Sequence, residues 1–187
     1  MTWRANGTAR WLAAVMAVGC VLEISGSAAR SEFKGYFDVT GISLPMLGQP
    51  AWQQRADGQT IRFICASSEI CPLPTAIEIK GVLRTESLPA AFVRGPLSPE
   101  ELTRQGQINA KAKGSRFLGA IGVKIGGIEG VQMTAAVGAE SKPIHFVTTW
   151  LGGGDRMLDV KITSPDLALA RRLSGDVLEP LVRQMFK

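Results

Sequence analysis

The stretch that decides the fold runs from residue 117 to residue 165 and reads FLGAIGVKIGGIEGVQMTAAVGAESKPIHFVTTWLGGGDRMLDVKITSP. It is rich in β-branched residues, and turns that contain glycine interrupt it at nearly regular intervals. Apolar runs bounded by such turns predict four strands, near residues 117–125, 129–137, 144–151 and 156–163. The sequences GAES and GGGD suit hairpin connections, so we expect successive strands to pair in antiparallel fashion.

More strands are predicted upstream of this stretch. GYFDVTGISLPM favours a strand that opens at Tyr36. PAWQQRADGQTIRFIC predicts a hairpin, since ADGQ is a turn signal between two extended runs, the second from Thr60 to Cys65. In TAIEIKGVLR, Ile77 and Ile79 alternate with polar neighbours, which indicates another strand.

Two helices are predicted from their start signals. In the middle of the chain, Ser98 can serve as N-cap, with Pro99 at the first helical position and Glu101 at the third. Gly106 interrupts the pattern, so we expect either a short, largely exposed helix or two turns and a kink, ended by Gly114.

The second predicted helix occupies the C-terminal end of the chain. We expect it to begin with Ser164 as N-cap and Pro165 at the first position, with Asp166 in the first turn, and to break or bend at Gly175 and Pro180. Its apolar stripe would lie on the sheet. The stripe comprises Leu167, Ala170, Leu173, Val177, Leu178, Leu181 and Met185.

The order of elements is strands, one helix, four strands and a terminal helix. This order predicts an α+β fold, in which an antiparallel β-sheet packs with a middle helix and a C-terminal amphipathic helix in a single domain.

The first residues of the chain predict export. Arg4 and Arg10 precede an uncharged, mostly apolar run, and small residues follow in SGSAAR. These are the parts of a secretory signal peptide, and we expect cleavage after Ala29. Residues 1–29 would then be the signal peptide and residues 30–187 one periplasmic or secreted domain. Two alternatives stay open, a retained N-terminal membrane anchor and a lipoprotein acylated at Cys20.

Cleavage would leave Cys65 and Cys71 as the two thiols of the mature chain. An even cysteine count in an oxidising compartment predicts one disulfide. Their spacing does not fit a Cys-x-x-Cys redox pair, and a zinc site would need two further ligands. Closing the loop between them would stabilise the fold by about 2.4 kcal/mol in the chain-entropy treatment.

Two segments resemble PsbP/Mog1-like domains. YFDVTGISLPMLGQPAW is similar to the opening strand and loop of that family, and IHFVTTWLGGGDRMLDVKITSP, followed by a terminal helix, is similar to its end. The resemblance is one of pattern, over about two-thirds of the chain. It implies a binding or assembly module without catalytic residues, although fold does not determine function.

The sequence offers little catalytic machinery. No GxSxG motif surrounds a serine, and His145, the single histidine, stands in a predicted strand. Asp155, Asp159 and Glu140 flank the same hairpin, which leaves open a hydrolase that uses His145 with a nearby carboxylate. The glycines in GAIGVKIGGIEG lack the spacing of a phosphate loop. We therefore expect no catalytic residue, no metal site and no cofactor.

Four residues are candidates for binding. Trp52 and Trp150 could stack on a ligand, and Arg171 and Arg172 could contact an acidic partner or anionic lipid. The formal net charge of +5 does not mark a nucleic-acid binder. The favoured hypothesis is a small exported, non-enzymatic binding or accessory protein whose partner is an envelope protein or complex. No nucleic acid and no stable membrane span are expected.

Overall fold

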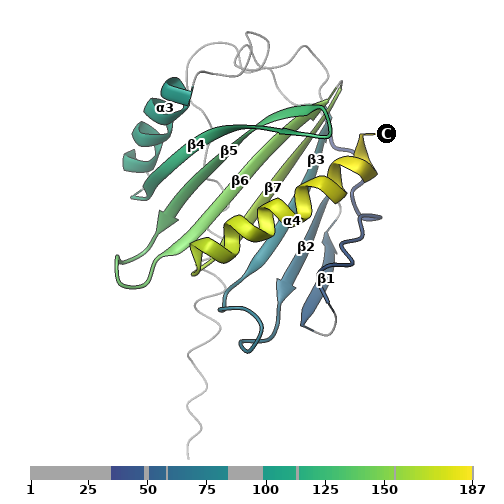
Figure 1. The fold of residues 1–187 in the computed structure, drawn as a ribbon, viewed down its shortest axis with the longest axis horizontal. Coiled ribbons are helices and arrows are strands. Elements are labelled where there is room, and N and C mark those ends of the chain that lie inside the picture. Colours follow the sequence, from purple (N-terminus) through teal and green to yellow (C-terminus); the bar gives the residue numbers. More distant parts are fainter. Residues whose placement is uncertain are drawn as a thin grey trace, which may run out of the picture.

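The computed structural model describes residues 35–48, 51–57, 59–83, 99–112, 114–153 and 155–186. Over these ranges the chain forms one antiparallel sheet of seven strands, with a helix across one of its faces (Figure 1). The strands are β1 (Trp52–Asp57), β2 (Thr60–Cys65), β3 (Ala76–Leu83), β4 (Arg116–Ile125), β5 (Ile128–Val137), β6 (Ile144–Gly153) and β7 (Arg156–Ser164). The helices are α3 (Pro99–Ala112) and α4 (Leu167–Met185).

The fold is α+β in a single domain, and its strands lie close to where the sequence predicted them. β4 to β7 form three successive hairpins, and the bounds of these strands differ from the expected ones by two residues at most. β1 and β2 form the expected hairpin around Ala56–Gln59. The predicted signal peptide, Cys20 and Ser98 lie outside the described residues.

One pairing joins the two halves of the sheet. β3 lies antiparallel to β7, and the ladder runs from Ala76 opposite Thr163 to Leu83 opposite Arg156. The strand order is consequently β1-β2-β3-β7-β6-β5-β4, with the first three strands on one side of β7 and the other three on its far side. This pairing makes β3, β7 and β6 the central strands of the sheet.

The core lies between α4 and the sheet. Alternate residues of the central strands point toward α4 and are buried completely, among them Ile61, Ile77, Ile79, Val147, Leu158 and Ile162. α4 contributes the buried face Leu169, Ala170, Leu173, Ser174, Val177, Leu178, Leu181 and Val182. Each fully buried aliphatic side chain contributes roughly 1.5–3 kcal/mol, so this layer is the main source of stability.

The segment after Tyr36 is not the strand that was predicted. Tyr36 makes one isolated bridge to Val82, and the chain then continues through turns. Its apolar residues are nonetheless buried, because they enter the α4 side of the core instead of pairing along an edge: Val39, Ile42, Leu44 and Leu47. The side-chain amide of Gln184 holds this segment to α4, accepting from the Ser43 N–H at 3.1 Å and donating to the Ser43 carbonyl at 3.0 Å.

α4 differs from its prediction in the residue that caps it and in the absence of a break. The N-cap is Asp166, whose carboxylate accepts from the N–H groups of Ala168 and Leu169 at 2.8 and 3.1 Å. Ser164 was predicted as the cap but belongs to β7, where its buried hydroxyl lies 3.0 Å from that of Thr75. The helix also runs through Gly175 and Pro180 without a break.

Pro180 is tolerated inside α4 because little is lost there and packing holds the helix. Proline removes the bond that would reach the carbonyl four residues earlier, on Asp176. Asp176 is on the exposed side of α4, where its carbonyl can be hydrated, and the neighbouring turns are fixed by the buried face. Packing on the sheet therefore outweighs the local helix-breaking signal.

α3 is a single helix of 14 residues that packs chiefly against β4. It begins at Pro99 as predicted, and Gly114 follows its end with φ +63°. No kink occurs at Gly106. This glycine instead lies against the ring of Phe117, and a Cβ atom added there would be 2.7 Å or less from three of the ring carbons. Glycine thus permits close approach of α3 to β4.

Gly130 provides a test of the sheet geometry. It is buried in β5, opposite Leu151, and a Cβ at this position would collide with the backbone carbonyl of Trp150 and approach the Leu151 side chain to 2.8 Å. Relief would require separation of β5 from β6. We expect Gly130→Ala to reduce the free energy of unfolding by about 3 kcal/mol or more, measured by chemical denaturation.

Gly122→Ala is the matched control, because Gly122 pairs with the residue next to Gly130 and has no atom within 4 Å of its added Cβ. Its effect should stay within about 0.5 kcal/mol. Equal stabilities of the two variants would contradict the close packing of β5 on β6.

Candidate functional site

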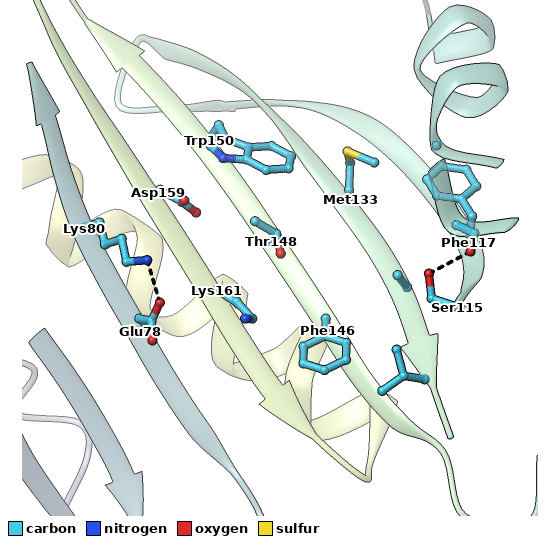
Figure 2. A pocket seen from close by; sticks show the side chains of 14 residues that line it. Glu78, Lys80, Ser115, Phe117, Met133, Phe146, Thr148, Trp150, Asp159 and Lys161 are labelled. Atoms are coloured by element: carbon cyan, nitrogen blue, oxygen red, sulfur yellow. Dashed lines mark hydrogen bonds and ion pairs between the residues drawn. The ribbon is translucent and has the colours of Figure 1, made fainter. Parts of the chain in front are cut away.

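The sheet face opposite α4 carries a hollow. Figure 2 shows the side chains that line it, and its cavity volume is about 80 Å³. α3 contributes Gly106 and Ala110 to one wall, and the sheet supplies the floor. Among the described residues, the sheet side is lined by Glu78, Lys80, Ser115, Phe117, Met133, Ala135, Val137, Phe146, Thr148, Trp150, Asp159 and Lys161.

One side of the hollow is charged, and the β3–β7 pairing creates it. Glu78 of β3 lies directly opposite Lys161 of β7, and Lys80 lies opposite Asp159. Both oxygens of Glu78 are engaged, Oε2 with Arg62 Nε at 2.7 Å and Oε1 with Lys80 Nζ at 3.1 Å. These half-buried groups form an ionic cluster across β2, β3 and β7.

Burial affects the protonation of these groups in different ways. Burial alone would raise the pKa of Glu78, but the hydrogen bond from Arg62 and the charge of Lys80 hold that pKa below its ordinary value. For Asp159, burial raises the pKa, and neither the charge of Lys80 nor a hydrogen bond from Trp150 offsets the effect. Burial likewise lowers the pKa of Lys161. Asp159 and Lys161 therefore carry their charges at a cost.

The other side of the hollow is apolar. Trp150 and Phe117 pack against Val131 and Met133, which are buried, and this small cluster is separate from the core under α4. Phe146 stands beside it, and the Lys161 ammonium lies 5.2 Å from the centroid of the Phe146 ring. In Figure 2 the charged side chains come from the strands on one side and the apolar ones from the strands on the other.

The hollow contains one of the two tryptophans that the sequence singled out. Trp150 lies on its floor, half-buried. Trp52 lies on the opposite face of the sheet, next to Cys65 in the core, and is only 7% exposed. Trp52 also lines a separate hollow of about 200 Å³ beside Leu44 and Phe63, and its role as a stacking residue stays a prediction.

Arg171 and Arg172 lie on the exposed side of α4, on the face of the sheet away from the hollow. They do not converge with Trp150 on one site. Arg171 is close enough to His145 to lower its pKa, together with Arg116, although burial is the larger cause of that lowering.

His145 does not meet the carboxylates that its sequence context suggested. It stands opposite Ser164, at the far end of the β6–β7 hairpin from Asp155. Asp159 projects from the other sheet face, and Glu140 pairs with Arg116 at 3.2 Å. The Nδ1 atom of His145 is buried and has no hydrogen-bond partner among the described residues.

The two cysteines lie at disulfide distance, with their Cα atoms 6.5 Å apart. Cys65 ends β2, Cys71 lies in the loop that leads to β3, and both are buried. The loop is folded back by a hydrogen bond from the Cys71 N–H to the Ser67 carbonyl at 3.1 Å. The loop anchors the end of β2 into the core.

The charged residues of the hollow were not singled out from the sequence as a site. Their signal is alternation, because Glu78 and Lys80 alternate with buried residues in β3, and Asp159 and Lys161 alternate with buried residues in β7. Alternation of this kind predicts a hydrated sheet face. Only the pairing of β3 with β7 shows that the four residues meet.

Two searches of the described part of the chain are negative. None of its helices combines the length and the hydrophobicity needed to cross a membrane. No group of three or more histidine, cysteine, aspartate or glutamate side chains is placed there to hold a metal ion.

Comparisons with known proteins do not identify a family. No protein-family model and no curated protein matches the sequence. A crystal structure of a protein of unknown function from Pseudomonas aeruginosa is similar with a TM-score of 0.46 and 16% identity, over 70% of this chain and 84% of that one.

A second structure, from Bacteroides thetaiotaomicron VPI-5482, has a TM-score of 0.36 and 15% identity, over 63% of this chain and 36% of that one. Likenesses at this level establish neither the fold nor the function of this chain. The resemblance to PsbP/Mog1-like domains stays a prediction.

The charge on Asp159 should cost stability. Because the pKa is raised in the fold, the folded chain takes up a proton there more readily than the unfolded chain, whose value is near 3.8. Asp159→Asn should therefore raise the melting temperature at pH 7 by a few degrees, and the gain should shrink as the pH falls toward 3.8. Thermal unfolding at several pH values measures both effects.

Asp155→Asn is the control, since Asp155 is exposed in the β6–β7 turn. It should leave the melting temperature unchanged across the same pH range. A loss of stability in Asp159→Asn at pH 7 would show that the carboxylate is well satisfied in the fold, contrary to the shifted pKa.

Proposed function

We propose that this protein is a small exported binding or accessory protein of the cell envelope, and that it binds through the hollow between α3 and the sheet. The observation that carries the proposal is the combination of half-buried ionised groups with an aromatic floor in one concavity. Binding sites are typically concave, mostly apolar and equipped with a few convergent polar groups. Groups with perturbed pKa values gather at such sites.

Stability alone does not account for Asp159 and Lys161. Each is held where burial opposes its charge, and neither has an ion-pair partner within 4.0 Å among the described residues. Natural proteins keep costly polar groups most often where function uses them. The face of the sheet covered by α4, by contrast, is a conventional apolar core.

Export rests on two independent features. The first is the signal-like sequence of residues 1–29. The second is the buried Cys65–Cys71 pair at disulfide distance, which fits an oxidising compartment. The sequence resemblance to a family of binding and assembly modules agrees with an accessory role. A non-enzymatic protein is favoured because His145 and the carboxylates named with it do not form a catalytic group.

Filling the hollow should abolish binding. Thr148 lies on its floor between Phe146 and Trp150, so Thr148→Tyr adds a ring there without removing a core contact. We expect this variant to fold normally and to lose the envelope partner that co-purifies with the wild type. Quantitative mass spectrometry of the captured proteins measures the loss, and unchanged melting temperature establishes folding.

Gln53→Tyr is the matched control, because Gln53 is exposed on β1, on the same sheet face but at its opposite edge. It should capture the partner as the wild type does. Equal capture by Thr148→Tyr would place the binding surface elsewhere.

Export predicts the chemical state of the cysteines and the N-terminus. Protein recovered from its native envelope should begin at residue 30, give or take two residues, and Cys65 and Cys71 should resist alkylation until a reductant is added. Intact-mass analysis before and after alkylation measures both. An intact signal segment with two free thiols would contradict export.

The second candidate is a periplasmic hydrolase that uses His145. The observation in its favour is the buried, unpartnered Nδ1 atom, close enough to Asp166 for that carboxylate to influence the His145 pKa. A catalytic role predicts that His145→Ala abolishes turnover of an ester or glycan substrate, and Thr148→Tyr, on the other sheet face, should leave such turnover unchanged.

A further inference from the structure

The polarity of the hollow changes from one side to the other, and the strand register defines how. One row of directly paired residues crosses the same sheet face from β2 to β4: Arg62, Glu78, Lys161, Thr148, Met133 and Ala120. Its character changes along the row from ionic, through the hydroxyl of Thr148, to apolar. The parallel row through Asp159 changes in the same way, since Trp150 and Val131 follow it.

The free position for a charged ligand group is at Lys161. Both oxygens of Glu78 are occupied by Arg62 and Lys80. The Lys161 ammonium therefore faces a carboxylate that already binds two other cations, and no acidic oxygen lies within 4.0 Å of it in the described part of the chain. An ammonium can donate three hydrogen bonds, so a ligand anion could accept one from Lys161.

The balance of charge around this position favours an anion. Three cations, Arg62, Lys80 and Lys161, stand against the carboxylates of Glu78 and Asp159. Asp159, whose negative charge would oppose an anion, lies between Lys80 and Trp150, its directly paired neighbours on the two adjacent strands. Because its pKa is raised, it can also take up a proton more easily than an ordinary carboxyl group.

The apolar part of a ligand has its own position beside Lys161. Thr148 is the direct neighbour of Lys161, and Met133 is the neighbour of Thr148. Two strand spacings, roughly 10 Å, therefore separate β7, which carries Lys161, from β5, which carries Met133. An unbranched chain of about eight carbons is long enough to reach from one to the other, between Phe146 and Trp150.

We infer that the hollow binds a small amphipathic carboxylate, with the carboxylate at Lys161 and Thr148 and the apolar body on Met133, Phe117 and Trp150. This inference rests on the proposed function, because it names the ligand class of the same site. A cationic amphiphile would instead place its head against Lys161 and the two neighbouring cations. A neutral one could offer the Lys161 ammonium only an uncharged, weaker acceptor.

Three probes of equal chain length test the head group. Octanoate, 1-octanol and octylammonium are titrated into the full chain by isothermal calorimetry. We expect octanoate to bind about tenfold or more tightly than octanol, as a charge-assisted hydrogen bond predicts, and octylammonium to bind most weakly. Tighter binding of octylammonium, or equal binding of all three, would overturn the inference.

Lys161→Met separates head-group recognition from apolar contact, since methionine keeps much of the aliphatic length beside Phe146. It should lower the affinity for octanoate to that for octanol and leave octanol unchanged. Lys124→Met is the matched control, because Lys124 is an exposed cation on the same sheet face, paired with Glu129 at 3.3 Å. It should bind all three probes as the wild type does. Unaltered octanoate binding by Lys161→Met would overturn the inference.

Thr148→Tyr separates this inference from the proposed function. It should abolish octanoate binding, and retention of that binding would place the carboxylate site elsewhere. If no probe binds the wild type while Thr148→Tyr still loses its envelope partner, the inference fails and the proposed function stands. If octanoate binds as expected but Thr148→Tyr captures the partner normally, the hollow is a ligand site and the proposal that it holds the envelope partner fails.

Discussion

The pairing of β3 with β7 is the constraint on which the rest of the structure depends. The two strands are almost eighty positions apart, and their ladder joins the β1–β3 unit to the β4–β7 meander in one sheet. The pairing is antiparallel, so one register places isoleucines and valines under α4 and charged residues on the opposite face. A slip by one residue would exchange the two faces and expose the core. The core and the hollow are therefore two consequences of a single register.

The two faces of the sheet differ in composition, since one forms the apolar core and the other carries the charged residues of the hollow. α4 covers one face and forms the main hydrophobic core with it, and neither Gly175 nor Pro180 breaks the helix. On the other face, α3 is the helix that packs on the sheet within the described part of the chain, and Asp159 and Lys161 lie there in an environment that opposes their charges. The hydrophobic core under α4 offsets the free-energy cost of keeping these two charges half-buried. Such an arrangement is typical of a rigid scaffold with a binding surface.

Most of the fold was predictable because its signals are local. β-branched runs, glycine turns and the GGGD hairpin identified β4 to β7, and the ADGQ turn identified β1 and β2. The errors arose where tertiary contacts outweigh local preference. The segment after Tyr36 has the composition of a strand, but its apolar residues enter the core without pairing. Ser164 has the sequence context of a cap, but β7 extends through it, and Asp166 takes that role. For the candidate site, sequence identified Trp150, considered Asp159 only as a partner of His145, and missed Glu78, Lys80 and Lys161.

The sequence by itself determined the strands, the two described helices, the α+β class and the closeness of Cys65 to Cys71, since each follows from residues near one another in the chain. Only the tertiary structure decided that β3 and β7 are neighbours, because hydrophobic alternation makes every strand compatible with many partners. That pairing placed Glu78 beside Lys161 and Lys80 beside Asp159. It also brought all four residues next to the apolar side of the hollow. From the sequence, the alternation of charged and buried residues indicates only a hydrated sheet face. The non-local pairing makes those charged residues one wall of a hollow.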